Sequence, residues 1–315
     1  MTLAYSNMPL DRCTNQRKNK RWLNSEFTRE NTLFCPVKES MSLFDKNDNT
    51  SPHFLNKEQL APISIDSCIF LGRSDNCAYF AIDYSKLRFS TQEQLEILGQ
   101  WLKLRQVTSL LNSEAASILA LAKGLVHWHK SHQFCGSCGN VNRSVEAGHA
   151  RKCTECRNLT FPRTDPAVIM LVERIFSDGV PRCLLGRQAS WDDGVYSTLA
   201  GFVDPGETLE EAVIREVLEE TGINATDPQY CTSQPWPFPA SVMLGFTAEA
   251  TSEAIDISHD DLEDAQWFSR EQLVDFSINK KNKQKIQNKG YKMSSSDSIS
   301  SFLITAWKNK EIGKY

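Results

Sequence analysis

The 315-residue sequence lacks any apolar run that approaches the roughly 18 residues needed to span a membrane. Its polar beginning contains no signal-peptide core, and its last residues, Gly-Lys-Tyr, are not a peroxisomal address of the Ser-Lys-Leu type. An excess of one charge is also lacking, because the formal net charge is only −4. No general field therefore attracts nucleic acid or an anionic membrane, and any polyanion must bind at a local patch. We expect a soluble, cytoplasmic protein with no membrane partner.

Disulfide bonds are not expected either, although the sequence contains ten cysteines. Six are scattered singly and are interpreted as small apolar residues in a reducing compartment. The other four form two C-x2-C pairs, and each pair makes a knuckle whose thiolates face one ion. A redox role needs one reactive pair and a catalytic zinc needs an open coordination position, so both are minor alternatives. We expect one structural zinc ion per chain, bound by Cys135, Cys138, Cys153 and Cys156.

The first part of the chain predicts a domain that contains β-structure. Residues 1–60 are polar and irregular, and residues 45–53 read as a surface loop. The runs CIFLG and CAYFAID follow, separated by RSDN, and predict a hairpin. Residues 112–132 then show alanine and leucine at helical spacing behind an Asn-Ser cap, and predict a helix that connects to the cysteine cluster. We expect the cysteine knuckles to staple two domains together.

The last part of the chain predicts a sheet with helices packed against it. Residues 167–172, AVIMLV, are typical of a strand buried on both faces, and residues 241–249 supply a further strand. The segments SREQLVDF and SISSFLITAWKNK predict later helices. Residues 279–298 contain six lysines before their first acid, Asp297. Such a run is typical of a solvated loop, and the alternative is an arm that contacts phosphates.

Residues 201–223, GFVDPGETLEEAVIREVLEETGI, predict a turn followed by an acidic helix. Thr208 with Glu211 forms a capping box, and Gly222 occupies the C-terminal cap, so the helix covers about residues 208–221. Its buried stripe consists of Leu209, Val213 and Val217.

Three carboxylates share the adjacent face of this helix, since Glu216, Glu219 and Glu220 are spaced i, i+3 and i+4. Their repulsion costs roughly a few tenths of a kcal/mol per pair in water and more in a cleft, unless a divalent cation neutralises it. A solvated acidic face is the alternative. Oxygen ligands select Mg²⁺ or Mn²⁺ rather than zinc.

The spacing from Gly201 to Ile223 resembles the Nudix box, G-x5-E-x7-R-E-U-x-E-E-x-G-U, at every fixed position. The resemblance implies a Nudix fold over about residues 160–315 and hydrolysis of a nucleoside diphosphate linked to another group. In-line attack by a metal-bound water suits these residues. Glu216 and Glu220 would be metal ligands, Glu219 a ligand or the acceptor of the water's proton, and Arg215 would orient the carboxylates. The resemblance also implies that Glu207 supports the loop and Arg215, and that the Ala200 carbonyl completes a metal's coordination.

The loop that follows, SQPWPFPAS at residues 233–241, contains three prolines that fix an extended conformation. It is expected to hold Trp236 and Phe238 out as surfaces on which flat bases stack. Core packing or a protein-binding polyproline segment is the alternative. The loop resembles the SQPWPFPxS signature of the NADH pyrophosphatase branch of the Nudix superfamily. FPRTDPAVIM at residues 161–170, MPLDR, LRQV and WHKSHQFCGSCG also resemble sequences of that branch.

This resemblance implies an α+β chain of three domains: an N-terminal domain at residues 1–130, a zinc ribbon at 131–160 and a Nudix α/β/α sandwich with a mixed sheet at 161–315. It implies a homodimer with two or three catalytic Mg²⁺ or Mn²⁺ ions that converts NADH and water to reduced nicotinamide mononucleotide and AMP, with NAD⁺ as a related substrate. Phe202 and the partner subunit's Phe161 would sandwich the nicotinamide. The substrate contacts carried over are Arg105, Glu146, Phe161, Phe202, Gln234, Pro235, Trp236, Pro237, Phe238, Pro239, Ala240, Ser241 and Ser300.

Two positions depart from the pattern of the branch. Asp261 stands where a metal-binding acid is usually Glu, so it would reach a metal through water, or Asp260 or Glu263 would substitute for it. Phe161 stands where Tyr is usual, which keeps stacking and loses any phenol hydrogen bond.

Two other functions compete with NAD(H) hydrolysis. The first is removal of the NAD cap from RNA 5′ ends, which the lysine-rich segment favours. The second is a non-catalytic NAD-sensing or nucleic-acid-binding module, which the complete set of Nudix-box carboxylates disfavours.

Overall fold

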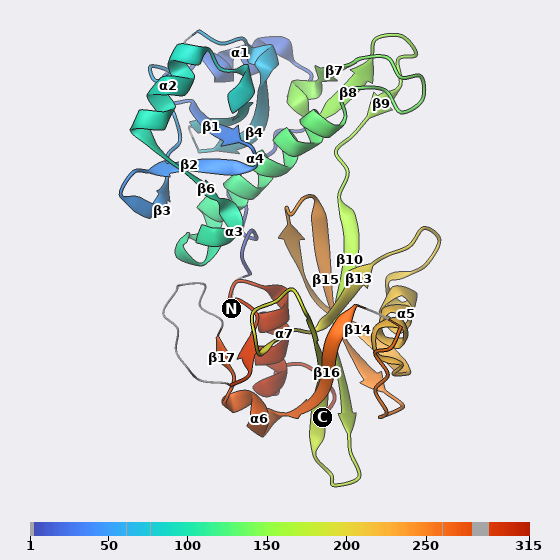
Figure 1. The fold of residues 1–315 in the computed structure, drawn as a ribbon. Coiled ribbons are helices and arrows are strands. Elements are labelled where there is room, and N and C mark those ends of the chain that lie inside the picture. Colours follow the sequence, from blue (N-terminus) through green and yellow to red (C-terminus); the bar gives the residue numbers. More distant parts are fainter. Residues whose placement is uncertain (1–2, 61, 76, 260, 279–289) are drawn as a thin grey trace. The chain divides into compact units, whose positions relative to one another are not determined.

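The computed structural model describes residues 3–60, 62–75, 77–259, 261–278 and 290–315. The chain forms two compact units, which are coloured along the sequence in Figure 1. The N-terminal unit runs to Thr164 and also includes Trp236–Ala240. The C-terminal unit comprises Asp165–Pro235 and Ser241–Tyr315. A short segment that follows Pro235 in the chain therefore packs with the N-terminal unit.

The N-terminal unit is built on a mixed sheet with the order β3-β2-β1-β5-β4, in which β6 also pairs with β2. β1 and β5 are parallel, whereas the predicted hairpin is the antiparallel pair β4–β5. The strands are β1 Leu33–Lys38, β2 Met41–Asp45, β3 Asp48–Pro52, β4 Cys68–Ser74, β5 Cys77–Asp83 and β6 Gly99–Lys103. The helices are α1 Lys20–Thr28, α2 Phe89–Leu98, α3 Leu104–Val107 and α4 Ser113–Ser131.

The prediction of an irregular beginning with a loop at residues 45–53 was wrong. This region holds α1 and three strands, and β3 pairs with β2 at the end of the strand order. The β3 side chains are exposed or half-buried, so its sequence, DNTSP, carries no apolar alternation. Hydrogen bonds from Thr50 and Ser51 to the Asp48 carboxylate hold this polar strand locally.

The predicted helix at residues 112–132 is confirmed as α4, with Asn112 as its N-cap. It packs against β1, β4 and β5 and contributes Ile118, Leu119, Leu125 and others to the core of the N-terminal unit. Figure 1 shows α4 running along the sheet and then leading to β7. The helix is therefore part of this core as well as a connection.

The cysteine-bearing segment forms an antiparallel sheet, β7-β8-β9, made of Asn142–Val145, Ala150–Cys153 and Leu159–Thr160. Two histidines join it to the rest of the N-terminal unit. His149 Nε2 donates to the Phe70 carbonyl at 2.6 Å, and His129 Nε2 donates to the Gly148 carbonyl at 2.8 Å. Gly148 has φ +93°, and a Cβ there would lie 2.7 Å from Ile69 Cγ2. The close approach requires glycine.

The C-terminal unit contains a mixed sheet with the order β14-β15-β10-β11-β16, in which β13 also pairs with β10. β10 and β15 are parallel, and β10 is antiparallel to β11 and β13. A small sheet, β12-β18-β17, completes the unit. The strands are β10 Asp165–Ile175, β11 Pro181–Gln188, β12 Val195–Tyr196, β13 Leu199–Phe202, β14 Ala225–Trp236, β15 Ser241–Ala250, β16 Leu262–Ser269, β17 Ser277–Ile278 and β18 Lys292–Met293. The helices are α5 Leu209–Thr221, α6 Arg270–Val274 and α7 Ile299–Lys308.

The central strand β10 is buried on both faces, as its continuous apolar run predicted. Val168, Met170 and Val172 form one core cluster with Val213 and Val217 of α5. On the other face, the buried Glu173 carboxylate accepts a hydrogen bond of 2.7 Å from Trp307 Nε1 of α7. Successive side chains of a strand point to opposite faces, so the sheet lies between α5 and α7 (Figure 1). The predicted α/β/α arrangement is confirmed.

Candidate functional site

The acidic helix α5 begins and ends with the caps that the sequence predicted. Thr208 Oγ1 accepts a hydrogen bond from the Glu211 N–H, and the Glu211 carboxylate accepts one from the Thr208 N–H at 2.7 Å. Gly222 has φ +68°, and its N–H donates to the Leu218 carbonyl at 2.8 Å. Val213 and Val217 are fully buried, and Leu209 packs against the same cluster. The caps and the buried stripe together fix the rotation of α5, and hence the face that its carboxylates occupy.

Arg215 binds three carboxylates and a carbonyl at once. Its guanidinium donates two hydrogen bonds to Glu207, at 2.5 and 3.0 Å, one to Glu216 at 2.9 Å and one to Glu219 at 2.8 Å. A fifth reaches the Phe202 carbonyl of β13 at 2.9 Å. Arg215 therefore ties the strand, the loop and the helix of the Nudix box together. The hydrogen bonds and the nearby carboxylates raise the pKa of Arg215 above its usual value.

Glu207 is the carboxylate that Arg215 binds through two nitrogens. Hydrogen bonds from Arg215 and from the Asp204 N–H stabilise its charged form and lower its pKa to about 2. Glu207 consequently remains ionised across the physiological range. The structure places it as a brace between the loop and Arg215.

Glu216 lies directly against Gly201 of β13. A Cβ built on Gly201 would fall 1.8 Å from the Glu216 carboxyl carbon, so no larger residue fits without moving the carboxylate. Ala200 is the preceding residue of the same strand and pairs with Ile169 of β10. Of the remaining two acids, Glu220 is 9% exposed and Glu219 lies at the surface. The three predicted ligands thus occupy one face of α5 at different depths.

The donor set suits a hard divalent cation. Three carboxyl groups, those of Glu207, Glu216 and Glu219, share the guanidinium of Arg215, and the buried Glu220 adds a fourth on the same helix. All the candidate ligand atoms are oxygens, which Mg²⁺ and Mn²⁺ prefer, and the glycine at position 201 leaves a cradle for the Glu216 carboxylate. Within the described residues, these carboxylates are not gathered within 4.8 Å of one another, since the cysteine cluster alone meets that limit.

Three acids near the start of β16 were candidates for the downstream metal-binding position, and their surroundings differ. Asp261 is exposed and immediately precedes β16. The Glu263 carboxylate, on β16, forms an ion pair with Arg187 of the neighbouring strand β11. Asp260 lies outside the described residues. The assignment of Asp261 as a metal ligand stays a prediction.

Gln234 anchors the start of the proline-rich loop inside the C-terminal unit. Its buried side chain donates to the Asp297 carbonyl at 2.7 Å and accepts from the Ile299 N–H at 2.8 Å. Ser300, the next residue of α7, is also buried and bonds the Ser197 hydroxyl at 2.8 Å and the Thr198 N–H at 3.0 Å. Its side chain consequently faces the interior of this unit.

The expectation that Trp236 and Phe238 are held out to solvent was wrong. Both rings are half-buried against a core cluster of the N-terminal unit, with their centroids 5.2 Å apart. Tyr5 meets both rings edge-on, and the Arg105 guanidinium lies 5.2 Å from the Trp236 centroid. Aromatic rings gain more by such burial than by exposure. The peptide bond that follows Phe238 is cis.

Lys123 of α4 was not among the predicted residues; it is 6% exposed and donates a hydrogen bond to the Pro237 carbonyl. A signal was present, because Lys123 is the only Asp, Glu, Lys or Arg between Glu114 and Lys130 in an otherwise apolar helix.

Three other predicted substrate residues are at least partly accessible. Phe161 and Phe202 are 53% and 59% exposed, so both side chains are accessible. Glu146 forms an ion pair with Lys18 at 3.1 Å. It lines a hollow of about 650 Å³ formed by residues of α1 and the cysteine-bearing segment.

The four cysteines converge with the geometry of a tetrahedral thiolate site. Their sulfur atoms lie within 4.8 Å of one another, and three of the separations are 3.4, 3.5 and 3.6 Å. Zinc–sulfur bonds of about 2.3 Å imply sulfur separations of about 3.8 Å, so one zinc ion fits.

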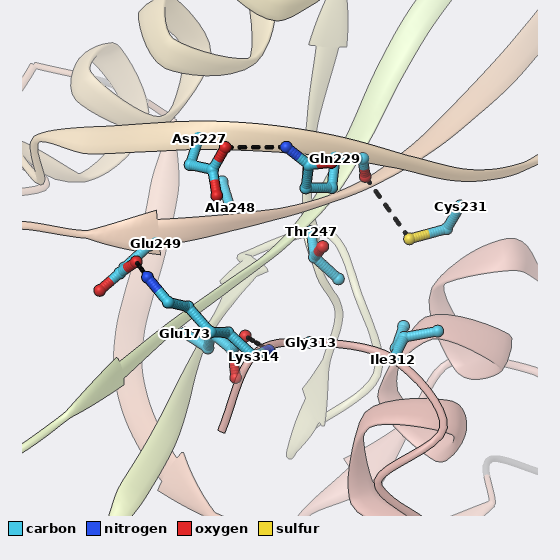
Figure 2. Close-up of a pocket in the computed structure, with 10 residues that line it drawn as sticks. All are labelled: Glu173, Asp227, Gln229, Cys231, Thr247, Ala248, Glu249, Ile312, Gly313 and Lys314. Atoms are coloured by element: carbon cyan, nitrogen blue, oxygen red, sulfur yellow. Dashed lines mark hydrogen bonds and ion pairs between the residues drawn. The ribbon is translucent and has the colours of Figure 1, made fainter.

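Figure 2 shows a separate cavity of about 460 Å³ on the α7 face of the sheet. The C-terminal residues border it, and Lys314 Nζ binds Glu249 at 2.7 Å there. None of the predicted catalytic or substrate residues lines this cavity. The candidate site is therefore the one at α5 and β13.

Family comparison agrees with this site. The NUDIX domain model matches residues 164–289, the NADH pyrophosphatase-like rudimentary NUDIX domain model matches residues 30–128, and the NADH pyrophosphatase zinc ribbon domain model matches residues 130–161. The chain belongs to the NADH pyrophosphatase family of the Nudix superfamily. The zinc ribbon match and the cysteine geometry together identify a structural zinc site. The Nudix domain implies a divalent metal as well.

Three relatives illustrate how this Nudix protein compares with known sequences. NAD-capped RNA hydrolase NUDT12 of Macaca fascicularis is 44% identical over 173 residues, which are 52% of this chain and 37% of that protein. NAD(P)H pyrophosphatase NUDT13, mitochondrial, of Mus musculus is 39% identical over 67% of this chain and 62% of that protein. NAD-capped RNA hydrolase NudC of Deinococcus radiodurans is 44% identical over 54% of this chain and 61% of that protein. The similarity thus spans less than two thirds of each relative. Among the described residues, no helix is long and apolar enough to cross a membrane.

Gly201→Ala tests the packing of Glu216 in the Nudix site. The added Cβ displaces the Glu216 carboxylate, and we expect Mn²⁺ affinity to fall about 10- to 100-fold, the range seen when residues that support metal ligands are changed. Electron paramagnetic resonance of free Mn²⁺ measures the affinity. Gly124→Ala is the matched control, because a Cβ there meets nothing within 4 Å. Equal affinities for the Gly201 variant and the wild type would contradict the arrangement.

Proposed function

We propose that the protein hydrolyses the pyrophosphate bond of NAD(H) in a metal-dependent reaction that gives NMN(H) and AMP. The observation that carries this proposal is the complete set of Nudix-box carboxylates: Glu207, Glu216 and Glu219 bond Arg215, and Glu220 is buried on the same helix as Arg215. The SQPWPFPAS loop selects the substrate class, and relatives named for NAD(P)H pyrophosphatase and NAD-capped RNA hydrolase activity support it.

In the proposed mechanism, the protein positions a pyrophosphate against its carboxylates. Two or three Mg²⁺ or Mn²⁺ ions would neutralise the pyrophosphate oxygens and lower the pKa of the attacking water. Glu216 and Glu220 would hold the metal, with the Ala200 carbonyl and Asp261 as further ligands. Glu219 is the most exposed of the three helix acids and would bind metal or accept the water's proton. Arg215 keeps Glu216 and Glu219 in place through charge-assisted hydrogen bonds.

Substrate binding is proposed to use exposed aromatic faces and the proline-rich loop. Phe202 and the partner subunit's Phe161 would enclose the nicotinamide in a homodimer. Phe161 and Phe202 are both exposed in this chain. The remainder of the dinucleotide would contact the loop Gln234–Ser241, Arg105 and Glu146. Ser300 of α7 is proposed as a further substrate contact.

We propose domain limits at 1–130, 131–160 and 161–315, and a cytoplasmic location.

The proposal predicts that the protein releases AMP and reduced NMN from NADH with Mg²⁺ or Mn²⁺, and releases neither in excess EDTA. We expect Glu220→Gln to lower kcat by about 100-fold or more, since a catalytic acid–base or electrostatic group contributes about that factor. Glu210→Gln, on the exposed first turn of the same helix, should stay within about twofold of wild type in this comparison. Chromatographic separation of the nucleotides measures all the rates. Equal rates for wild type and Glu220→Gln would contradict the role assigned to Glu220, and a wild type that releases no AMP would favour a non-catalytic NAD-binding role.

NAD-capped RNA is the second candidate substrate. Two of the relatives described above carry the name NAD-capped RNA hydrolase, and capped RNA presents the same NAD end as the free dinucleotide. The lysine-rich segment favours RNA because phosphates beyond the cap need cationic partners. Residues 279–289 of this segment lie outside the described residues, so only the sequence supports a role for these lysines.

Neutralising five of these lysines separates the two substrates. With Lys280, Lys281, Lys283, Lys285 and Lys289 replaced by Gln, we expect kcat/KM for capped RNA to fall while that for free NADH remains unchanged. The dependence of the RNA rate on salt should also weaken, because fewer counterions are released on binding. Lys308→Gln with Lys310→Gln, at the end of α7, serves as the control. A ratio of the two kcat/KM values that does not change would remove the lysines from RNA recognition.

A further inference from the structure

Lys123 is a buried cation in the middle of α4. It is 6% exposed, and its ammonium donates a hydrogen bond to the Pro237 carbonyl. The same nitrogen lies 4.8 Å from the centroid of the Phe238 ring. Within the part of the chain that the structure describes, Lys123 forms no ion pair with a carboxylate. A backbone carbonyl and an aromatic face are thus its main partners.

Burial of the Lys123 ammonium is unfavourable for folding. A charged amine taken out of water loses hydration, and burial accordingly lowers the pKa of Lys123. The neighbouring residues of α4, from Ile118 to Val126, are otherwise apolar or small, and an apolar side chain at position 123 would avoid this cost. The lysine is therefore better explained by what it holds than by the packing of α4.

What Lys123 holds is the segment Trp236–Ala240. Pro237 is buried, so its carbonyl depends on a protein donor, and the ammonium supplies one. Lys123 and Arg105 both approach the Phe238 ring, and Arg105 also covers the Trp236 ring. Tyr5 meets both rings edge-on. The two rings are thus enclosed by a tyrosine and two cations, all from the N-terminal unit.

We propose that Lys123 is a positioning residue that fixes Trp236–Ala240 in the conformation that binds the dinucleotide. The ammonium does not touch the substrate; it acts through the Pro237 carbonyl and the Phe238 ring. This inference rests on the proposed function for its substrate, whereas the contact between Lys123 and the segment can be tested independently. Such a residue lowers KM by ordering the loop before the substrate arrives, because a preorganised loop loses less entropy on binding.

The test compares Lys123→Met, which removes the charge and the donor, with Lys123→Arg, which keeps both. Steady-state kinetics with NADH and Mn²⁺ gives KM and kcat, and hydrogen exchange with mass spectrometry follows the amides of Trp236, Phe238 and Ala240. Lys130→Met is the matched control on the same helix, because Lys130 pairs with Asp83 at 3.1 Å instead of with the loop. Circular dichroism checks that each variant is folded, and Lys123→Leu, which also lacks the charge and the donor, takes the place of the methionine variant if that one does not fold.

We expect Lys123→Met to raise KM about tenfold with kcat within about threefold, to speed exchange in residues 236–240, and to leave the remaining peptides unchanged. Lys123→Arg should restore most of the KM, and Lys130→Met should resemble wild type. Unchanged KM and exchange in Lys123→Met would overturn the inference. An equal rise in KM for the methionine and arginine variants would overturn it too, because packing alone would then explain the effect. A wild type that hydrolyses no NADH would sink the proposed function, and the exchange data would still decide whether Lys123 fixes the segment.

Discussion

The arrangement of the Nudix box depends on the guanidinium of Arg215. It is the only cation in the Nudix box, and it bonds Glu207, Glu216 and Glu219 together with the Phe202 carbonyl. A lysine could not reproduce these bonds, since an ammonium is a single point donor and a guanidinium is a planar fork. Without this cation, neighbouring carboxylates would repel one another and separate. One side chain therefore links a strand, a loop and a helix, and makes their crowded negative charge compatible with folding.

The remainder of the C-terminal unit serves to hold that arrangement still. The caps of α5 and its buried valines fix the helix against β10, and β13 brings Gly201 under the Glu216 carboxylate. In the N-terminal unit, the corresponding constraint is aromatic. Trp236 and Phe238 are half-buried, and their rings contact Tyr5, Arg105 and Lys123. The loop thus reaches its conformation through contacts as well as through its prolines.

Features with a local cause could be predicted from the sequence. The capping box at Thr208, the left-handed Gly222 and the apolar run of β10 are written in short stretches, and the structure reproduces each. The paired cysteine spacing was equally informative, because two knuckles can face only a shared ion. Features that depend on distant neighbours were missed. β3 is polar because its side chains remain outside the core, and the burial of Trp236 depends on Tyr5, more than two hundred residues away. Lys123 could have been noticed as a lone charge, but its partner, Pro237, could not.

NADH turnover by Arg215→Lys, measured alongside its unfolding curve, shows most directly whether the guanidinium organises the site. We expect a folded protein whose kcat falls by about 100-fold or more, because one ammonium cannot hold three carboxylates and a carbonyl in register. Wild-type turnover in this folded variant would refute this role of Arg215. The carboxylates would then be positioned without the guanidinium, and the constraint on which the site is argued to depend would not exist.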